Sequence, residues 1–324
     1  MTEHKTGYVA ILGLPNSGKS TLLNALLGQK LSITTAKPQT TRKRILGILS
    51  EENYQIIFLD TPGILSPSYL LQEKMMEDVR TSLNDADVIL IIIDVKEDPL
   101  AENLFSQDFV KENLVKSKKP KLLVLNKVDL LTQEKVTELI KHFEKQKLFE
   151  EVIPISASLN FNIQRVREEI LRFLPEEPKL FPDDQVTDEN ERFFVSEIIR
   201  EKILEFYRDE VPYSCEVLIV EFIERGNGLV TAEQTESGET EKLRSGARKS
   251  FISAEVVVER DSQKAIIIGK GGNAIKKLGE VARKSIEEFL QREVFLELRV
   301  KVRKKWRSDE NLLKNFGYFG KEKI

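Results

Sequence analysis

The sequence predicts an α/β protein in which a mostly parallel six-stranded sheet is followed by a smaller α+β domain. In the first half, short apolar runs alternate with amphipathic stretches of helical period, a pattern typical of parallel strands joined by helices on both faces. A proline-rich acidic segment begins at residue 175, and the order of elements changes after it. The 324 residues also exceed what one hydrophobic core usually supports, roughly 250–300 residues.

The apolar runs of the first half predict strands at residues 8–12, 45–49, 55–59, 88–93, 121–125 and 152–155. Amphipathic helices are predicted at residues 19–27, 70–83, 101–115, 133–145 and 163–173. Only a short polar turn separates the second and third strands, so we expect an antiparallel hairpin at one edge of the sheet.

A domain boundary is predicted where three prolines and four acidic residues fall within residues 175–184. We therefore expect a first domain at 1–174, a linker at 175–190 and a second domain at 191–324. The second domain is predicted to contain a helix at 191–207, strands at 215–223 and 251–259, a short and a long helix around 269–272, and a last strand at 294–302. The polar segment 225–249 is expected to be a mobile loop or a hairpin extension rather than a site.

Several classes of function are excluded by composition. The single cysteine, Cys215, cannot form an internal disulfide or a zinc site of several thiolates, and we expect it to be buried in a strand. His4 lies near the N-terminus and His142 on a predicted helix, which argues against histidine-based catalysis. The N-terminus lacks the apolar run of a signal peptide, and residues 88–93 are too few to span a bilayer. We expect a cytoplasmic protein.

The segment from Gly13 to Ser20 follows a strand and opens a helix, as a phosphate-binding loop does. In such a loop Lys19 can reach the β- and γ-phosphate oxygens, and the Ser20 hydroxyl can ligate Mg²⁺. The residues predicted to contact nucleotide here are Gly13, Asn16, Ser17, Gly18, Lys19, Ser20 and Thr21.

Three further motifs occur in one order along the chain, each at the end of a predicted strand. Asp60 can hold Mg²⁺ through water, and the Gly63 N–H can meet the γ-phosphate. The carboxylate of Asp129 can accept two guanine donors that adenine lacks. Because ligands bind outside the carboxyl ends of strands in open α/β sheets, these motifs predict one GTP and Mg²⁺ site. At Ser156 and Ala157, a backbone N–H can meet guanine O6. The predicted contacts beyond the phosphate loop are Asp60, Gly63, Asn126, Lys127, Asp129, Ser156 and Ala157.

These motifs are similar to those of translation-factor-like GTPases related to Ras, and the chain resembles the Era family among them. Era-like residues are 39–42, Asp60-Thr-Pro-Gly63, Asp261-Ser-Gln-Lys264 and Trp306-Arg-Ser-Asp309. The resemblance covers nearly the whole chain and implies a Ras-like GTPase fold. It departs from the family at 225–249, which looks longer than usual and puts the pairing of the flanking strands in doubt.

The resemblance also implies roles for individual residues. Thr41, rather than Thr40, is expected to ligate Mg²⁺ and sense the γ-phosphate, so the expected catalytic residues are Lys19, Thr41 and Gly63. Ile64 stands where Ras-like proteins have a water-orienting glutamine, and we interpret it as a packing residue in a slow enzyme. Asn16 resembles an asparagine of related GTPases that bind K⁺ beside the phosphates, although it can equally serve only to tie the loop together.

A Gly-x-x-Gly turn between two helices, with the α-β-β-α-α-β order around it, matches a type II KH module. Charged residues beside such a turn are candidates for contact with an RNA backbone. Trp306 can either stack on a base or pack under a C-terminal helix at 311–316. The predicted RNA-binding residues are Gly269, Lys270, Gly271, Gly272, Lys276, Lys277, Arg303, Lys304 and Lys305.

The expected function, implied by the Era resemblance, is a GTP-hydrolysing switch that binds small-subunit ribosomal RNA near its 3′ end. We expect a monomer that acts on the pre-30S particle and so assists small-subunit assembly. Two alternatives remain open. The nucleotide can be only a structural ligand of an RNA-binding chaperone, or the basic residues within 299–307 can attach a peripheral GTPase to the inner face of the cell membrane.

Overall fold

The computed structural model describes residues 4–224 and 249–319, and its contacts divide the chain into two compact units. The first unit contains Met1–Glu189 together with Arg307–Ile324, and the second contains Asn190–Trp306. The second domain was expected to span the whole of 191–324, so the structure differs for the C-terminal segment that begins at Arg307. One cause is the Lys43 ammonium, which donates a hydrogen bond to the Phe316 carbonyl at 2.7 Å.

The first unit is built on a six-stranded sheet with the order β2-β3-β1-β4-β5-β6. All neighbouring strands are parallel except β2 and β3, which form the expected edge hairpin. This confirms the mostly parallel sheet. The strands are β1 (Lys5–Leu12), β2 (Ile45–Ser50), β3 (Tyr54–Asp60), β4 (Val88–Asp94), β5 (Lys121–Asn126) and β6 (Glu151–Ile155).

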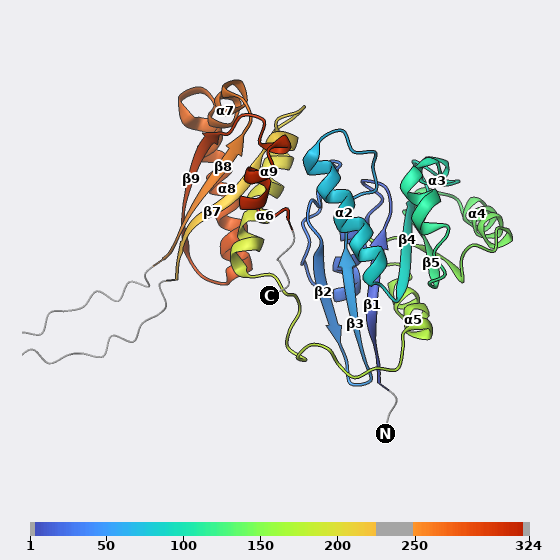
Figure 1. Ribbon diagram of the computed structural model, residues 1–324. Helices are drawn as coiled ribbons and strands as arrows, with labels where there is room; N and C mark the ends of the chain where they lie inside the picture. Colours follow the sequence, from blue (N-terminus) through green and yellow to red (C-terminus); the bar gives the residue numbers. More distant parts are fainter. Residues whose placement is uncertain (1–3, 225–248, 320–324) are drawn as a thin grey trace, which may run out of the picture. The chain divides into compact units, whose positions relative to one another are not determined.

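Helices cover both faces of this sheet (Figure 1). Along β4, Val88, Leu90 and Ile92 pack on the face covered by α1 (Lys19–Leu27) and α5 (Ile163–Phe173). The alternate residues Ile89, Ile91 and Ile93 pack on the opposite face. That face is covered by α2 (Leu70–Asp85), α3 (Glu102–Ser106) and α4 (Gln133–Lys145). Burial on both sides explains why β4 is apolar without interruption.

The helix predicted at 101–115 is wrong in one respect, because two pieces replace it. α3 ends at Ser106, Gln107 has an extended backbone, and a π-helical turn, η1 (Val110–Leu114), follows. Leu104, Val110 and Leu114 are all buried in the same core. A spacing of six residues turns an α-helix by about 240°, so one continuous helix could not bury both Leu104 and Val110 on one face. The break restores that alignment.

The expected linker is held along the β2–β3 hairpin. The buried side chain of Gln55 accepts hydrogen bonds from the N–H groups of Leu180 and Phe181 at 2.8 and 2.9 Å. Its amide nitrogen donates to the Phe181 carbonyl at 2.8 Å. Farther along, the Ile48 N–H donates to the Val186 carbonyl at 2.7 Å. The segment therefore belongs to the first unit as far as Glu189.

The second unit has the predicted α-β-β-α-α-β order. β7 (Glu216–Ile223) runs antiparallel to β8 (Ser250–Val258), and β8 runs parallel to β9 (Val294–Val302). Ile223 pairs with Phe251, so the strands flanking the insertion do pair; residues 225–248 lie outside the described part of the chain. The helices are α6 (Glu191–Phe206), α7 (Asp261–Ile268) and α8 (Asn273–Leu290).

The remaining short helices are η2 (Val128–Leu130), η3 (Pro212–Ser214), η4 (Lys270–Gly272), η5 (Trp306–Ser308) and α9 (Glu310–Asn315). Cys215 is buried, as expected, in the core of the second unit, just before β7. Every helix in the described ranges is too short or too polar to cross a lipid bilayer.

Candidate functional site

The phosphate loop between β1 and α1 needs glycine at two positions. Gly18 has a φ of +98°, and a Cβ there would lie 2.2 Å from the amide nitrogen of Asn126. A Cβ on Gly13 would lie 2.4 Å from the Ile92 carbonyl oxygen. The loop therefore lies directly against the ends of the neighbouring strands, and its backbone N–H groups can approach a ligand closely.

Lys19 is held at the centre of this loop. Its side chain is 5% exposed, and Nζ donates to the carbonyls of Leu14 at 2.8 Å and Gly13 at 3.2 Å. Burial lowers the pKa of the Lys19 ammonium to about 8, although the nearby Asp60 carboxylate opposes this shift. Phosphate oxygens would compensate the buried charge far better than two carbonyls do.

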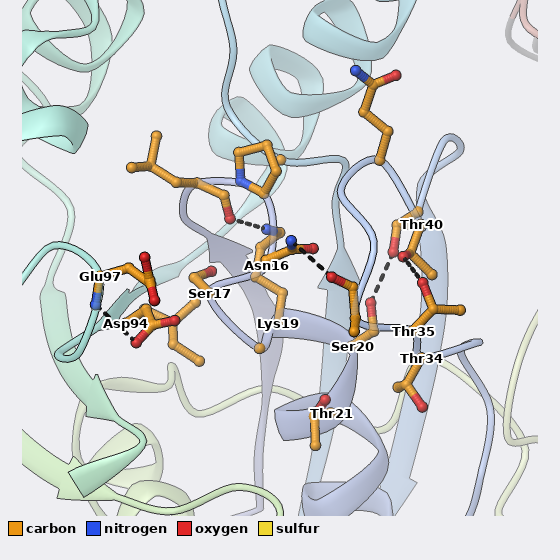
Figure 2. A pocket seen from close by; sticks show the side chains of 18 of the residues that line it. Asn16, Ser17, Lys19, Ser20, Thr21, Thr34, Thr35, Thr40, Asp94 and Glu97 are labelled. Carbon is orange, nitrogen blue, oxygen red and sulfur yellow. Dashed lines mark hydrogen bonds between the residues drawn. The ribbon is translucent and has the colours of Figure 1, made fainter. Parts of the chain in front are cut away.

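A cavity of about 620 Å³ opens around Lys19. Figure 2 shows Ser20, Thr35 and Thr40 on one side of Lys19, and Asp94 and Glu97 on the other. The lining residues come from the phosphate loop, the segment 33–41, Gly63, the end of β4 and Lys127. The structure thus brings most of the predicted phosphate-side residues to one cavity.

Ser20 and Thr41, which line this cavity, meet the buried side chain of Asp60. The Ser20 hydroxyl donates to Asp60 Oδ2 at 2.8 Å and lies 2.8 Å from the Thr41 hydroxyl. Thr40 is engaged elsewhere, because its hydroxyl contacts Thr35 at 2.9 Å and donates to the Lys37 carbonyl at 2.8 Å. The geometry therefore brings Thr41, not Thr40, to Ser20 and Asp60.

This arrangement fits a hard divalent cation. Asp60 is fully buried, and its Oδ1 accepts no hydrogen bond among the described residues. Burial raises the pKa of the Asp60 carboxyl, an effect that the Ser20 hydroxyl and the Lys19 ammonium oppose. No cluster of three or more acidic, histidine or cysteine side chains could hold a metal in the described ranges. Hydroxyl, water and phosphate oxygens would complete the set, as is usual for Mg²⁺.

On the guanine side, Asn126 connects two loops. Its amide nitrogen donates to the Ser17 carbonyl at 2.8 Å, and its Oδ1 accepts the Ala157 N–H at 3.0 Å. The Ala157 N–H was expected to meet guanine O6, whereas here it is paired with Asn126. The Ser156 N–H is likewise paired, with the Phe161 carbonyl at 3.3 Å.

Asp129 lies on η2 with an exposed side chain and does not line the 620 Å³ cavity. A second cavity of about 510 Å³ lies between α1 and the β6–α5 loop, and it includes Thr21 and Ala157. Of the predicted guanine contacts, Lys127 lines the phosphate cavity and Ala157 lines the second cavity, and Thr21 lines both cavities.

The segment after Asp60 packs tightly against the phosphate loop. A Cβ on Gly63 would lie 2.6 Å from the Pro15 nitrogen, and the Ile64 N–H donates to the Gly13 carbonyl at 3.0 Å. The Ile64 side chain is 1% exposed and belongs to the hydrophobic core. The packing interpretation of Ile64 is therefore confirmed.

Asn16 adopts a left-handed backbone, with φ of +64°, and its amide nitrogen donates to the Ala36 carbonyl at 3.1 Å. It thus ties the phosphate loop to the segment that carries Thr41. The amide oxygen makes no hydrogen bond within the described ranges and remains available as a cation ligand.

The Gly-x-x-Gly turn of the second unit is open to solvent. Gly271 and Gly272 both have left-handed φ values, and a Cβ on either would meet nothing within 4 Å. The lysines predicted to bind RNA, Lys270, Lys276 and Lys277, are all exposed. An RNA backbone can therefore reach this turn without displacing protein atoms.

Two apolar side chains near this turn were not identified from the sequence. Ile266 on α7 is 50% exposed and Phe206 on α6 is 41% exposed, and the Lys277 ammonium lies 5.7 Å from the Phe206 ring centroid. Which apolar residues near the turn face solvent depends on the tertiary packing, which the sequence pattern does not specify.

The basic residues in and after β9 divide into two groups. Lys301 forms an ion pair with Glu255 and Arg299 with Glu297, so these two charges are compensated on the sheet. The side chains of Arg303, Lys304 and Lys305 are exposed. Trp306 is fully buried, and its indole N–H donates to the Ser214 carbonyl at 2.8 Å. The structure therefore decides for packing of Trp306 and against base stacking.

The comparisons with known proteins agree with this geometry. Residues 8–127 match the family described as 50S ribosome-binding GTPase, and residues 239–307 match the KH domain. The chain is 45% identical to the chloroplastic GTPase ERA-like protein of Arabidopsis thaliana, over 98% of this chain and 70% of that protein. It is 42% identical to GTPase Era of Clostridium botulinum, over 97% and 98% of the two chains.

A solved structure of Era in complex with MgGDPNP and nucleotides 1506–1542 of 16S ribosomal RNA is similar over both units. It covers 97% of this chain and 99% of its own, with a TM-score of 0.86 and 39% sequence identity.

Proposed function

This chain belongs to the Era family of GTPases, and we propose that it is a GTP-hydrolysing switch that binds small-subunit ribosomal RNA and assists assembly of the pre-30S particle in the cytoplasm. The observation that carries the proposal is that Lys19, Ser20 and Thr41 line one cavity and that the Ser20 hydroxyl is hydrogen-bonded to the buried Asp60. An exposed Gly-x-x-Gly turn in the second unit supplies the RNA site.

In this proposal Lys19 leaves the loop carbonyls to pair with β- and γ-phosphate oxygens, where its charge is stabilised. Ser20, Thr41 and Asp60 would hold Mg²⁺, which neutralises charge on the transferred phosphoryl group. The Gly63 N–H meets the γ-phosphate. Because Ile64 is buried, no side chain at that position orients water, and we expect turnover well below the roughly 1–100 s⁻¹ of kinases.

We propose RNA rather than a membrane as the partner of the exposed basic residues. Arg303, Lys304 and Lys305 belong to the same unit as the Gly-x-x-Gly turn and its lysines. The similar Era structure contains nucleotides 1506–1542 of 16S ribosomal RNA, so the expected target is the 3′-terminal region of small-subunit RNA. An anionic lipid surface is the competing ligand of an exposed basic run.

Steady-state hydrolysis tests the switch against the alternative in which nucleotide only stabilises the fold. The wild-type protein should hydrolyse GTP with multiple turnovers, and a 3′-terminal small-subunit RNA should accelerate them. Asp129→Asn should lose GTP and accept XTP, because xanthine offers a carbonyl where guanine offers an amine. This change of substrate would assign the activity to this site. Absence of turnover with and without RNA would favour the structural-ligand alternative.

We also propose K⁺ as a second cation of the reaction, held in part by the Asn16 amide oxygen. A cation beside the phosphates would stabilise the charge that develops during hydrolysis, as an arginine finger does. Hydrolysis should be faster in KCl than in NaCl at equal ionic strength, and Asn16→Ala should remove the difference. Equal wild-type rates in the two salts would contradict this assignment.

A further inference from the structure

The end of β4 carries a buried carboxylate that the proposed hydrolysis does not use. Asp94 is the last residue of β4 and pairs in register with Asn126 at the end of β5. It is 7% exposed, and it lines the phosphate cavity. A buried carboxylate is costly unless it is paired, so its partners indicate what it does.

The two oxygens of Asp94 have different partners. Oδ1 accepts the N–H groups of Lys96 at 3.0 Å and Glu97 at 3.3 Å, which stabilises the turn after β4. Oδ2 forms an ion pair with the ammonium of Lys127. The same ammonium donates to the carbonyl of Asn16 in the phosphate loop at 3.2 Å.

Lys127 lies within the motif that we expect to bind guanine. It has a left-handed backbone, with φ of +69°, and it lies between Asn126 and the η2 turn that carries Asp129. Asn126 is already fixed by Ser17 and Ala157. The long Lys127 side chain is the part of this motif that would otherwise sample many rotamers, and Asp94 restricts it.

We infer that Asp94 is a positioning residue for guanine nucleotide: it holds Lys127 against the phosphate loop and thereby slows nucleotide release. The inference rests on the proposed nucleotide site and adds a residue to it. Preorganising Lys127 before binding lowers the ordering cost of the complex. Loss of the charge-assisted contact between Asp94 and Lys127 should weaken the affinity for guanine nucleotide about tenfold or more.

The test measures dissociation of ribose-labelled GDP by stopped flow in the full chain. Asp94→Asn keeps an oxygen that can accept the turn N–H groups and removes the charge that holds Lys127, so GDP release should be about tenfold faster. Asp87→Asn is the matched control. Asp87 precedes β4 at its other end, is not among the residues that line the cavity, and its carboxylate accepts the Tyr8 N–H at 2.8 Å. GDP release from this control variant should stay near the wild-type rate.

A double-mutant cycle with Lys127→Met separates positioning from a structural effect of the turn. Once the ammonium is gone, Asp94→Asn should accelerate release less than about twofold further. A wild-type rate for Asp94→Asn, or the same acceleration in the Lys127→Met background, would overturn the inference. If wild-type protein did not bind labelled GDP, the proposed function itself would fail.

Discussion

At the scale of single residues, Lys19 is an ammonium group whose charge the fold disfavours. Burial lowers its pKa to about 8 while only carbonyls and a nearby carboxylate compensate it. Phosphate oxygens would stabilise the charged form and raise that pKa. Between the two pKa values, the bound state holds more protons than the free state, so binding takes up a proton and affinity falls as pH rises above 8.

We therefore predict that binding of GDP with Mg²⁺ at pH 8.5 takes up more than about half a proton. Isothermal titration calorimetry in two buffers of different ionisation enthalpy measures this number directly. At pH 7 Lys19 is mostly charged in both the free and the nucleotide-bound protein, so proton uptake by Lys19 on binding should be close to zero. Identical heats in the two buffers at pH 8.5 would contradict this account of Lys19.

At the scale of elements, the segment from Arg307 to Phe319 contacts residues of the two segments that we expect to change with nucleotide, 33–44 and 63–70. The Lys43 ammonium, two residues after Thr41, donates to the Phe316 carbonyl and lies 4.7 Å from the Tyr318 ring centroid. The Arg307 guanidinium lies 4.8 Å from the centroid of Tyr69, the residue before α2. These contacts are internal to the first unit.

Lys43→Met should loosen the C-terminal segment, because it removes a charge-assisted hydrogen bond and a cation–π contact. Hydrogen exchange at residues 316–319 should become about tenfold faster or more, measured by mass spectrometry. Lys141→Met, a change of an exposed lysine on α4, is the control and should leave exchange there unchanged. Equal exchange in the two variants would show that Lys43 does not hold the segment.

The predictability of the elements depends on how local their causes are. β4 and the edge hairpin could be predicted because apolar runs and turn spacing are local signals. The break between α3 and η1 could not, since it arises from the need to bury Leu104 and Val110 together. The hydrogen bond from Lys43 to the Phe316 carbonyl joins residues 273 positions apart, so no local sequence pattern could predict it.

The candidate site shows the same division. Lys19, Ser20 and Asp60 could be predicted because strand-end motifs place them by a general rule of α/β sheets. The same rule points to Asp94, at the end of β4, although no motif drew attention to it. The pairing of the Ala157 N–H with Asn126 depends on how two loops meet, which the sequence does not specify.

At the scale of the whole molecule, the chain enters the second unit from the first at Asn190 and returns to it at Arg307. The entering segment is bonded to Gln55 and Ile48, and the returning one to Lys43. The returning segment is therefore bonded to a residue of 33–44, one of the two segments that we expect to change with nucleotide, whereas Ile48 and Gln55 lie farther along the chain on β2 and β3. A nucleotide that moves those segments can bias the second unit only if RNA binds the two states with different affinity.

In the proposed switch, the binding of nucleotide and the binding of RNA are coupled. Thermodynamic reciprocity allows this coupling to be measured through the affinity of either ligand. Typical coupling changes affinity by roughly 5–150-fold. The factor by which RNA tightens binding of the GTP analogue must equal the factor by which the analogue tightens binding of RNA. Thr41→Ala removes the expected γ-phosphate sensor, so it should bring this factor close to one while GDP affinity stays nearly intact.

The most direct measurement is a fluorescence titration of labelled 3′-terminal small-subunit RNA against the protein saturated with a non-hydrolysable GTP analogue or with GDP, in one buffer. The account predicts tighter RNA binding in the analogue state by a factor within that range, and nearly equal affinities in the two states for Thr41→Ala. Identical wild-type affinities in the two states would contradict it, because the two units would then be joined without being coupled.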